Sequence, residues 1–216
     1  MIDDVVLRRS VLDELSWDAT VDATHVGVTA VDGVVTLTGH VHSYPEIFAV
    51  RKCVRRVSGV KAVADELNVR LMSDDRREDS DIAESIVHVL QHNITLPNSN
   101  IQAEVRQGLV TLLGKVDWQY QRQHVEKQIA HVSGVLGVSN QIELLPRVTP
   151  ADVKEQIENA LERNAELEAQ HVSVEVKGDE VILIGSVKAY YERNIIEAAA
   201  WSAPGVHKVT DKISVG

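Results

Sequence analysis

One pattern occurs three times along the 216 residues, and it constrains the fold more than any other feature of the sequence. The run GVVTLTG at 33–39 returns as GLVTLLG at 108–114 and as DEVILIG at 179–185. The offsets are 75 and then 71 residues, and the same offsets relate the Gly-Val pairs at 59–60, 134–135 and 205–206. Because the register holds within each copy without a gap, the chain is a tandem repeat of one module of about seventy residues.

Each copy shows the same order of periodic patterns. Apolar residues spaced i, i+4 and i+8 predict a first helix, and two alternating runs around a glycine-containing turn predict an antiparallel hairpin. A second helical stripe and a third alternating run complete the module. In the first copy the two helical stripes are Leu7, Val11 and Leu15, then Val50, Val54 and Val57, and the turn is Asp32-Gly33.

The predicted fold class is α+β, with three tandem αββαβ modules, each a three-stranded mixed sheet with two helices on one face. We expect the modules at 1–70, 81–145 and 151–216, joined by a flexible charged linker at 71–80 and a proline-containing linker at 146–150. Modules of this size have marginal cores, so contacts between modules can add stability.

The charge of the chain argues against some partners. The formal net charge is −10, from 22 Lys and Arg against 32 Asp and Glu, and such a chain repels nucleic acid and anionic membrane surfaces at long range. No run reaches the ~18 apolar residues of a membrane-spanning helix. The acidic start at Met1–Asp4 shows no signal-peptide pattern. We therefore expect a soluble protein, cytoplasmic as the sequence stands, or periplasmic if a leader has been removed.

Two signatures resemble the BON domain family. They are the hairpin run Gly33–Gly39 with the following Val41, and the later step Val57-x-Gly59-Val60-x-x-Val63, and both recur in the second and third copies. The likeness covers nearly the whole chain. The resemblance implies a module that associates with phospholipid or membrane surfaces, in proteins linked to osmotic stress and to the integrity of the cell envelope.

We therefore expect a non-enzymatic protein whose three weak binding modules act together, since linked sites bind more tightly than single ones when geometry allows. The expected partners are phospholipid headgroups or a protein. The alternative is a cytoplasmic adaptor that binds a protein partner through exposed sheet edges and has no affinity for lipid.

Positions identical in all three copies carry no group that can do chemistry. All are apolar or glycine, and they include Val35, Leu37, Gly39, Val41, Gly59, Val60 and Val63, with their equivalents. None can transfer a proton, ligate a metal or attack a substrate. We expect no enzymatic activity and no cofactor, and any specificity must come from residues that differ between copies.

Two glycines in each module are expected to be structural. Gly39, Gly114 and Gly185 lie within strands, where a missing side chain allows a bulge or the close approach of a helix, or leaves a gap for a ligand. At the end of the second helix, Gly59, Gly134 and Gly205 suit a left-handed cap.

The nine histidines raise the question of a metal site. His88 and His92 share a helical face, and His40 and His42 lie on one side of a strand, but neither pair has further ligands in a zinc-binding pattern. We expect surface histidines and no metal. Cys53 has no base placed to activate it and is expected to be a partly buried helix residue.

A basic helix face distinguishes the first copy. Arg51, Lys52, Arg55 and Arg56 lie on its second helix, and the other copies lack them. These residues either pair with neighbouring acidic groups or contact lipid phosphate or an acidic partner.

Aromatic residues stand where the second helix begins in every copy. They are Tyr44, then Trp118 and Tyr120, then Tyr190 and Tyr191. Such rings either pack across the helix start or form a half-exposed rim, and a rim facing one way would suit a membrane interface.

Overall fold

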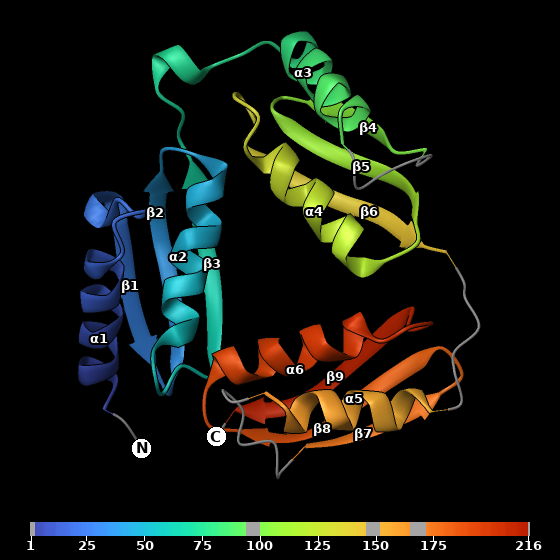
Figure 1. Cartoon of the computed structure of the whole chain (residues 1–216). Coiled ribbons are helices and arrows are strands. Elements are labelled where there is room, and N and C mark those ends of the chain that lie inside the picture. Colours follow the sequence, from blue (N-terminus) through green and yellow to red (C-terminus); the bar gives the residue numbers. More distant parts are fainter. Residues whose placement is uncertain (1–2, 94–99, 146–151, 165–171, 216) are drawn as a thin grey trace.

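The computed structural model describes residues 3–93, 100–145, 152–164 and 172–215. Within these ranges the predicted αββαβ order is present three times (Figure 1). The first module contains α1 (Asp4–Trp17), β1 (Val26–Val31), β2 (Val34–Val41), α2 (Tyr44–Arg56) and β3 (Ala62–Val69). The second contains α3 (Asp79–Gln91), β4 (Gln102–Arg106), β5 (Leu109–Val116), α4 (Gln119–Ala130) and β6 (Gly137–Leu144). The third contains α5 (Val153–Glu162), β7 (Val172–Lys177), β8 (Glu180–Val187), α6 (Tyr190–Ser202) and β9 (Lys208–Val215).

Each module has a three-stranded mixed sheet, which confirms the predicted fold class. The middle strand pairs antiparallel with its hairpin partner and parallel with the third strand, so the order is β1-β2-β3, β4-β5-β6 and β7-β8-β9. The parallel pair requires a crossover connection, and the second helix of each module supplies it.

Each module buries its own core between the helices and one face of the sheet. In the first module the α1 stripe of Leu7, Val11 and Leu15 is 0–1% exposed, and Leu37 of β2 is 0% exposed. Separate clusters of buried side chains form in the second and third modules. The predicted helical stripes therefore face the sheet, and the polar side chains between them face solvent.

The strand glycines are required by backbone geometry. Gly39 has φ +105° and Gly114 has φ +138°. A Cβ at Gly39 would lie 2.0 Å from the carbonyl oxygen of His25, and one at Gly114 would lie 2.6 Å from that of Asn100. The close approach is thus made by backbone just before the neighbouring strand and not by a helix. Gly59, Gly134 and Gly205 lie in the left-handed region, with φ of +90°, +93° and +82°.

The segment between the first two modules contains regular structure. Residues Ser73–Asp75 form a 3₁₀ turn, and α3 begins at Asp79, inside the linker expected at 71–80. Arg77 Nη1 donates to the carbonyl oxygens of Asp74 and Arg76 at 2.6 and 2.8 Å. The linker expected at 146–150 lies outside the described residues.

The second helices of the three modules meet one another around the centre of the molecule (Figure 1). Tyr44, at the start of α2, packs against the core of its own module and that of the second module. The start of α4 lies beside the end of α6. Tyr190, at the start of α6, lies beneath Arg55, near the end of α2. His131, directly after α4, lines one pocket together with Pro45 near the start of α2. Start therefore meets end at each contact, so the three modules form a closed ring.

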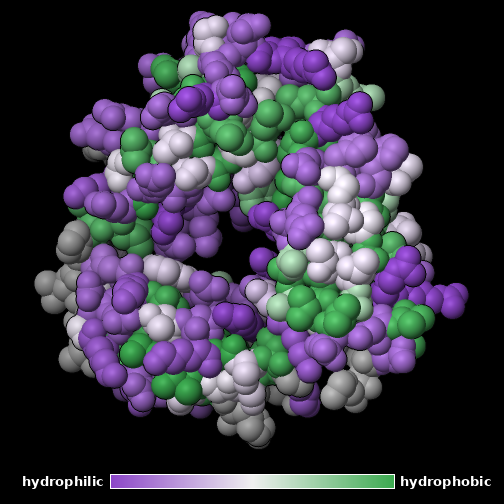
Figure 2. Space-filling view, turned by 180° about the vertical axis from the view of Figure 1, so that it is seen from behind, coloured by the Kyte–Doolittle hydropathy of each residue, from purple (hydrophilic) through white to green (hydrophobic). Residues whose placement is uncertain are grey.

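The middle of this ring is open on the face shown in Figure 2, where mostly hydrophilic residues border it. Among the helices of the described residues, none has the length and apolar character that crossing a membrane requires.

Candidate functional site

The basic face of α2 is partly occupied by contacts within the first module. Arg51 forms an ion pair with Asp65 of β3. Arg56 Nη2 lies 2.9 Å from Glu14 Oε1 and 3.1 Å from Asp18 Oδ2, both in the region of α1. Acidic groups of the same module therefore neutralise these two arginines, which hold α2 against β3 and α1.

The other two basic residues of this face have different surroundings. Arg55 places its guanidinium 5.3 Å from the ring centroid of Tyr190, and its Nε is buried without a hydrogen-bond partner. Arg193 approaches the same ring at 5.6 Å. Lys52 is exposed. The four basic residues thus do not form one continuous contact site, and Lys52 is the one whose charge faces solvent.

The contact between Arg51 and Asp65 has a counterpart in each of the other modules. The sequence reasoning missed this recurrence. The third strands carry Asp65, Asn140 and Asp211 at equivalent positions, and each side chain accepts a backbone N–H two residues further on, at 3.0, 3.2 and 2.8 Å. Asp211 also pairs with Arg193, and Asn140 donates to the backbone of α4. The signal was available, since a polar residue recurs here at the repeat offsets.

Three of the aromatic residues at the helix starts lie at different contacts between modules, so the five do not form one rim. Tyr44 packs against two cores, Trp118 faces the end of α6, and Tyr190 lies under the guanidinium groups. Tyr120 and Tyr191 are more open, with 59% and 36% of their surface exposed.

The histidines of the first module form a cluster that the sequence reasoning only partly anticipated. The rings of His25 and His40 stack with centroids 4.5 Å apart, and His42 lies edge-on, 6.0 Å from each. On α3, His88 and His92 are exposed, with ring centroids 6.1 Å apart. In the described part of the chain, no group of three or more His, Cys, Asp or Glu is placed to hold a metal ion.

This histidine cluster predicts a pH dependence of stability. Burial lowers the pKa of His40 below its ordinary value of 6.5, and the charges of His25, Arg70 and His42 lower it further. The folded state therefore favours neutral His40. Protonation of His40 lowers the free energy of unfolding, so the full stability is present above pH 6.5 and is lost as the pH falls through the lowered pKa. We expect the melting temperature of the first module to fall between pH 7 and pH 5, and to fall less in His40→Gln. An equal fall in both proteins would contradict this assignment.

Cys53 is fully buried, in contrast to the partial burial that the sequence suggested. Burial and the hydrogen bond from Sγ to Asp18 Oδ2, at 3.3 Å, together raise the pKa of its thiol to about 11. The thiol therefore stays protonated at neutral pH, and the thiolate is the reactive form.

We expect iodoacetamide at pH 8 to leave Cys53 unmodified in the native protein and to label it in urea, as measured by mass spectrometry. Rapid labelling without denaturant would show that this thiol is accessible and reactive.

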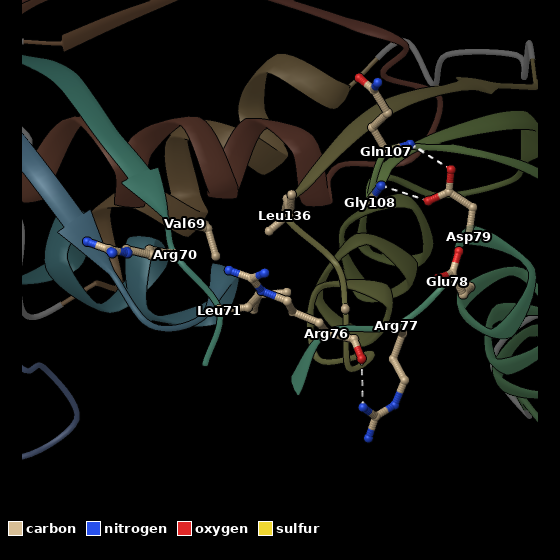
Figure 3. A pocket seen from close by; sticks show the side chains of 11 residues that line it. Val69, Arg70, Leu71, Arg76, Arg77, Glu78, Asp79, Gln107, Gly108 and Leu136 are labelled. Atoms are coloured by element: carbon tan, nitrogen blue, oxygen red, sulfur yellow. Dashed lines mark hydrogen bonds between the residues drawn. The ribbon is translucent and has the colours of Figure 1, made fainter. Parts of the chain in front are cut away.

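A cleft of about 510 Å³ lies between the end of β3 and the hairpin turn of the second module (Figure 3). The side chain of Arg76 extends into it toward Leu71, while Arg77 turns away. On the opposite wall, the Asp79 carboxylate accepts the backbone N–H groups of Gln107 and Gly108, at 2.7 and 2.9 Å. Of the three arginines that line the cleft, Arg76 is thus the one placed to meet an anionic group there.

All three modules match the model of one protein family. The BON domain model matches residues 3–70, 78–146 and 150–216, one match for each structural module. The chain belongs to the BON domain family. Osmotically-inducible protein Y of Escherichia coli (strain K12) is 28% identical over 145 residues, which cover 65% of this chain and 72% of that protein.

Solved structures give a weaker comparison for this BON-domain protein. Two structures of CdsD, a structural protein of the type III secretion system of Chlamydia trachomatis, are 17% and 15% identical to it. The matches cover 100% and 99% of this chain and 100% and 93% of those chains, with TM-scores of 0.27 and 0.28.

Proposed function

We propose that this BON-domain protein is a non-enzymatic binding protein of the osmotic stress response that associates with phospholipid surfaces. The observation that carries the proposal is that the positions identical in all three copies are apolar or glycine, within a family match over nearly the whole chain. Similarity to osmotically-inducible protein Y supports the stress role. The resemblance to membrane-associating BON modules supports the lipid surface as the ligand.

We assign the headgroup contact to two cations that face solvent. Lys52 is exposed on α2, and Arg76 extends into the cleft beside the second module. A basic residue near an anionic bilayer contributes about 1 kcal/mol, so two give weak attraction. The net charge of −10 opposes it at long range. Binding is therefore expected to be weak, local and sensitive to salt.

Co-sedimentation with vesicles tests this proposal. The full chain is mixed with vesicles of phosphatidylcholine, alone or with phosphatidylglycerol, at low and high salt. We expect pelleting only with the anionic vesicles at low salt, and its loss in the variant that combines Lys52→Ala with Arg76→Ala. The matched control pairs Lys154→Ala with Lys177→Ala, which removes the same charge from the third module, where both lysines are exposed. Absence of pelleting under every condition would remove lipid from the proposal.

A protein partner is the second candidate, favoured by the sheet edges. The outer strands β1 and β3, and their counterparts in the other modules, each have one strand neighbour among the described residues. Such an edge accepts an added strand from a partner through backbone hydrogen bonds. Affinity capture from cell lysate, followed by mass spectrometry, tests this candidate, and recovery of no specific partner would count against it.

We propose the cytoplasm as the compartment, with the periplasm as the alternative. The free, buried Cys53 suits a reducing compartment, although proteins without disulfides also occur outside the cytoplasm. Cell fractionation with detection of the protein in the periplasmic fraction would favour the alternative.

A further inference from the structure

The three contacts between second helices occupy equivalent positions in the repeat. The residue at or next to the helix start is Tyr44, Gln119 or Tyr190, and the equivalent residue near the helix end is Arg55, Ala130 or Trp201. At two of the contacts the tyrosine ring packs against residues of the neighbouring module. Tyr44 packs against two cores, and the ring of Tyr190 lies 5.3 Å from the guanidinium of Arg55.

The contact between α4 and α6 differs, because Gln119 stands where the other modules have tyrosine. A cavity of about 500 Å³ lies here, a volume typical of small-molecule sites. Its lining residues come from two modules: Trp118, Gln119, Tyr120 and Gln123 from the second, and Ala198, Trp201 and Ser202 from the third.

Gln119 provides an acceptor that the protein leaves unused. Its side-chain Oε1 is buried and has no hydrogen-bond partner. An unsatisfied buried oxygen costs about 1–3 kcal/mol. A turn of the Gln119 side chain that brings Oε1 to a ligand donor in the cavity would recover part of that cost.

The lining decides the chemical class of the ligand. None of its seven residues carries a formal charge, so an ionised headgroup would lose hydration without gaining a counter-charge. Two indoles and a phenol present flat apolar faces, while two amides present donors and acceptors. The hydroxyl of Ser202 already donates to the carbonyl oxygen of Ala198, at 2.8 Å, and keeps only its acceptor capacity. A pyranose ring matches both, since its C–H face is apolar and its edge carries hydroxyl donors. We infer that the junction of α4 and α6 binds a neutral sugar ring of an oligosaccharide, a function beyond the proposed lipid association.

A proline-rich peptide is the other ligand that aromatic grooves commonly accept. Proline has no backbone N–H, so a polyproline segment cannot donate to Gln119 Oε1. The unused acceptor therefore favours the sugar.

Nuclear magnetic resonance of the indole N–H groups tests the inference on the full ¹⁵N-labelled chain. The chain has three tryptophans, and Trp17, 86% exposed on α1, serves as an internal reference. Chitotriose and maltotriose are titrated separately to about 10 mM, which detects even millimolar affinity. We expect saturable shifts of the Trp118 and Trp201 signals with at least one saccharide, and none of Trp17.

Substitutions at Gln119 locate the site. Gln119→Tyr introduces the side chain found at the equivalent positions of the other modules, so it should occupy the cavity and weaken saccharide binding at least about tenfold. Gln119→Ala removes the acceptor and leaves the aromatic walls, so weaker binding is expected with the fold retained. Gln141→Tyr, at an exposed position of β6, is the matched control and should bind as the unmodified chain does.

Three outcomes would overturn the inference. The first is an absence of saturable shifts with both saccharides, and the second is unchanged affinity in both Gln119 variants. The third is that decaproline, and neither saccharide, shifts the Trp118 and Trp201 signals, which would assign the cavity to a proline-rich peptide. The vesicle experiment uses other residues, so either proposal can fail alone.

Discussion

Replacing Gly39 by alanine is expected to destabilise the first module by about 3–5 kcal/mol. The residue has φ +105°, which L side chains rarely adopt, and its Cβ would lie 2.0 Å from the carbonyl oxygen of His25. The obstacle is backbone, so relief requires β1 and β2 to move apart. Domains of ordinary stability have about 5–15 kcal/mol in total, so this change removes a large share.

Urea unfolding of the full chain, followed by circular dichroism and by amide signals of the module that carries the substitution, measures this loss. Gly178→Ala is the matched control, because Gly178 also has a positive φ, +65°, but a Cβ there would meet no atom within 4 Å beyond its chain neighbours. We expect the control to cost about 1 kcal/mol, from the backbone preference alone. Equal stability of the two variants would show that the contact with His25 relaxes without cost.

Replacing Asp79 by alanine is expected to destabilise the second module by about 2–3 kcal/mol. Its carboxylate accepts the N–H groups of Gln107 and Gly108, at 2.7 and 2.9 Å, and so ties the first turn of α3 to the hairpin (Figure 3). Gln107 has φ +53°, an unfavourable conformation for a residue with a side chain, and the two hydrogen bonds help to hold it.

The control for this prediction is Asp81→Ala, which removes an exposed carboxylate from the same helical turn. Both variants change the charge equally, so a difference between their urea midpoints reports the contacts with the hairpin. A midpoint for Asp79→Ala equal to that of the control would contradict the assigned role.

The first module contains the same contact between the first helix and the hairpin turn. Asp4 accepts from the N–H groups of Asp32 and Gly33, at 3.1 and 3.4 Å. Asp4 and Asp79 are related by the first repeat offset, and the second offset leads to Pro150, which has no carboxylate. The sequence reasoning missed this pair because it compared apolar positions, although the offset alone would have matched the two aspartates.

The partners of the basic residues on α2 could not be predicted from the sequence. The spacing of Arg51 and Arg55 placed them correctly on one helix, but their partners are distant in sequence. Asp65 lies on β3, and Tyr190 lies in another module. No local pattern encodes such a pairing, because it depends on how α2 packs on its own sheet and how the modules close into a ring.

The sequence by itself determined the triple repeat, the αββαβ order and the buried faces, because hydrophobic period and turn residues act within one module. It also determined that the positions identical in all three copies are apolar or glycine. Only the tertiary structure decided which charges are neutralised and which aromatic residues lie between modules. It also decided that Gln119 lines a cavity, while its equivalents Tyr44 and Tyr190 pack against a neighbouring module. The physical reason is that these contacts join segments distant in sequence, most of them from different modules. The periodicity of one segment cannot predict them.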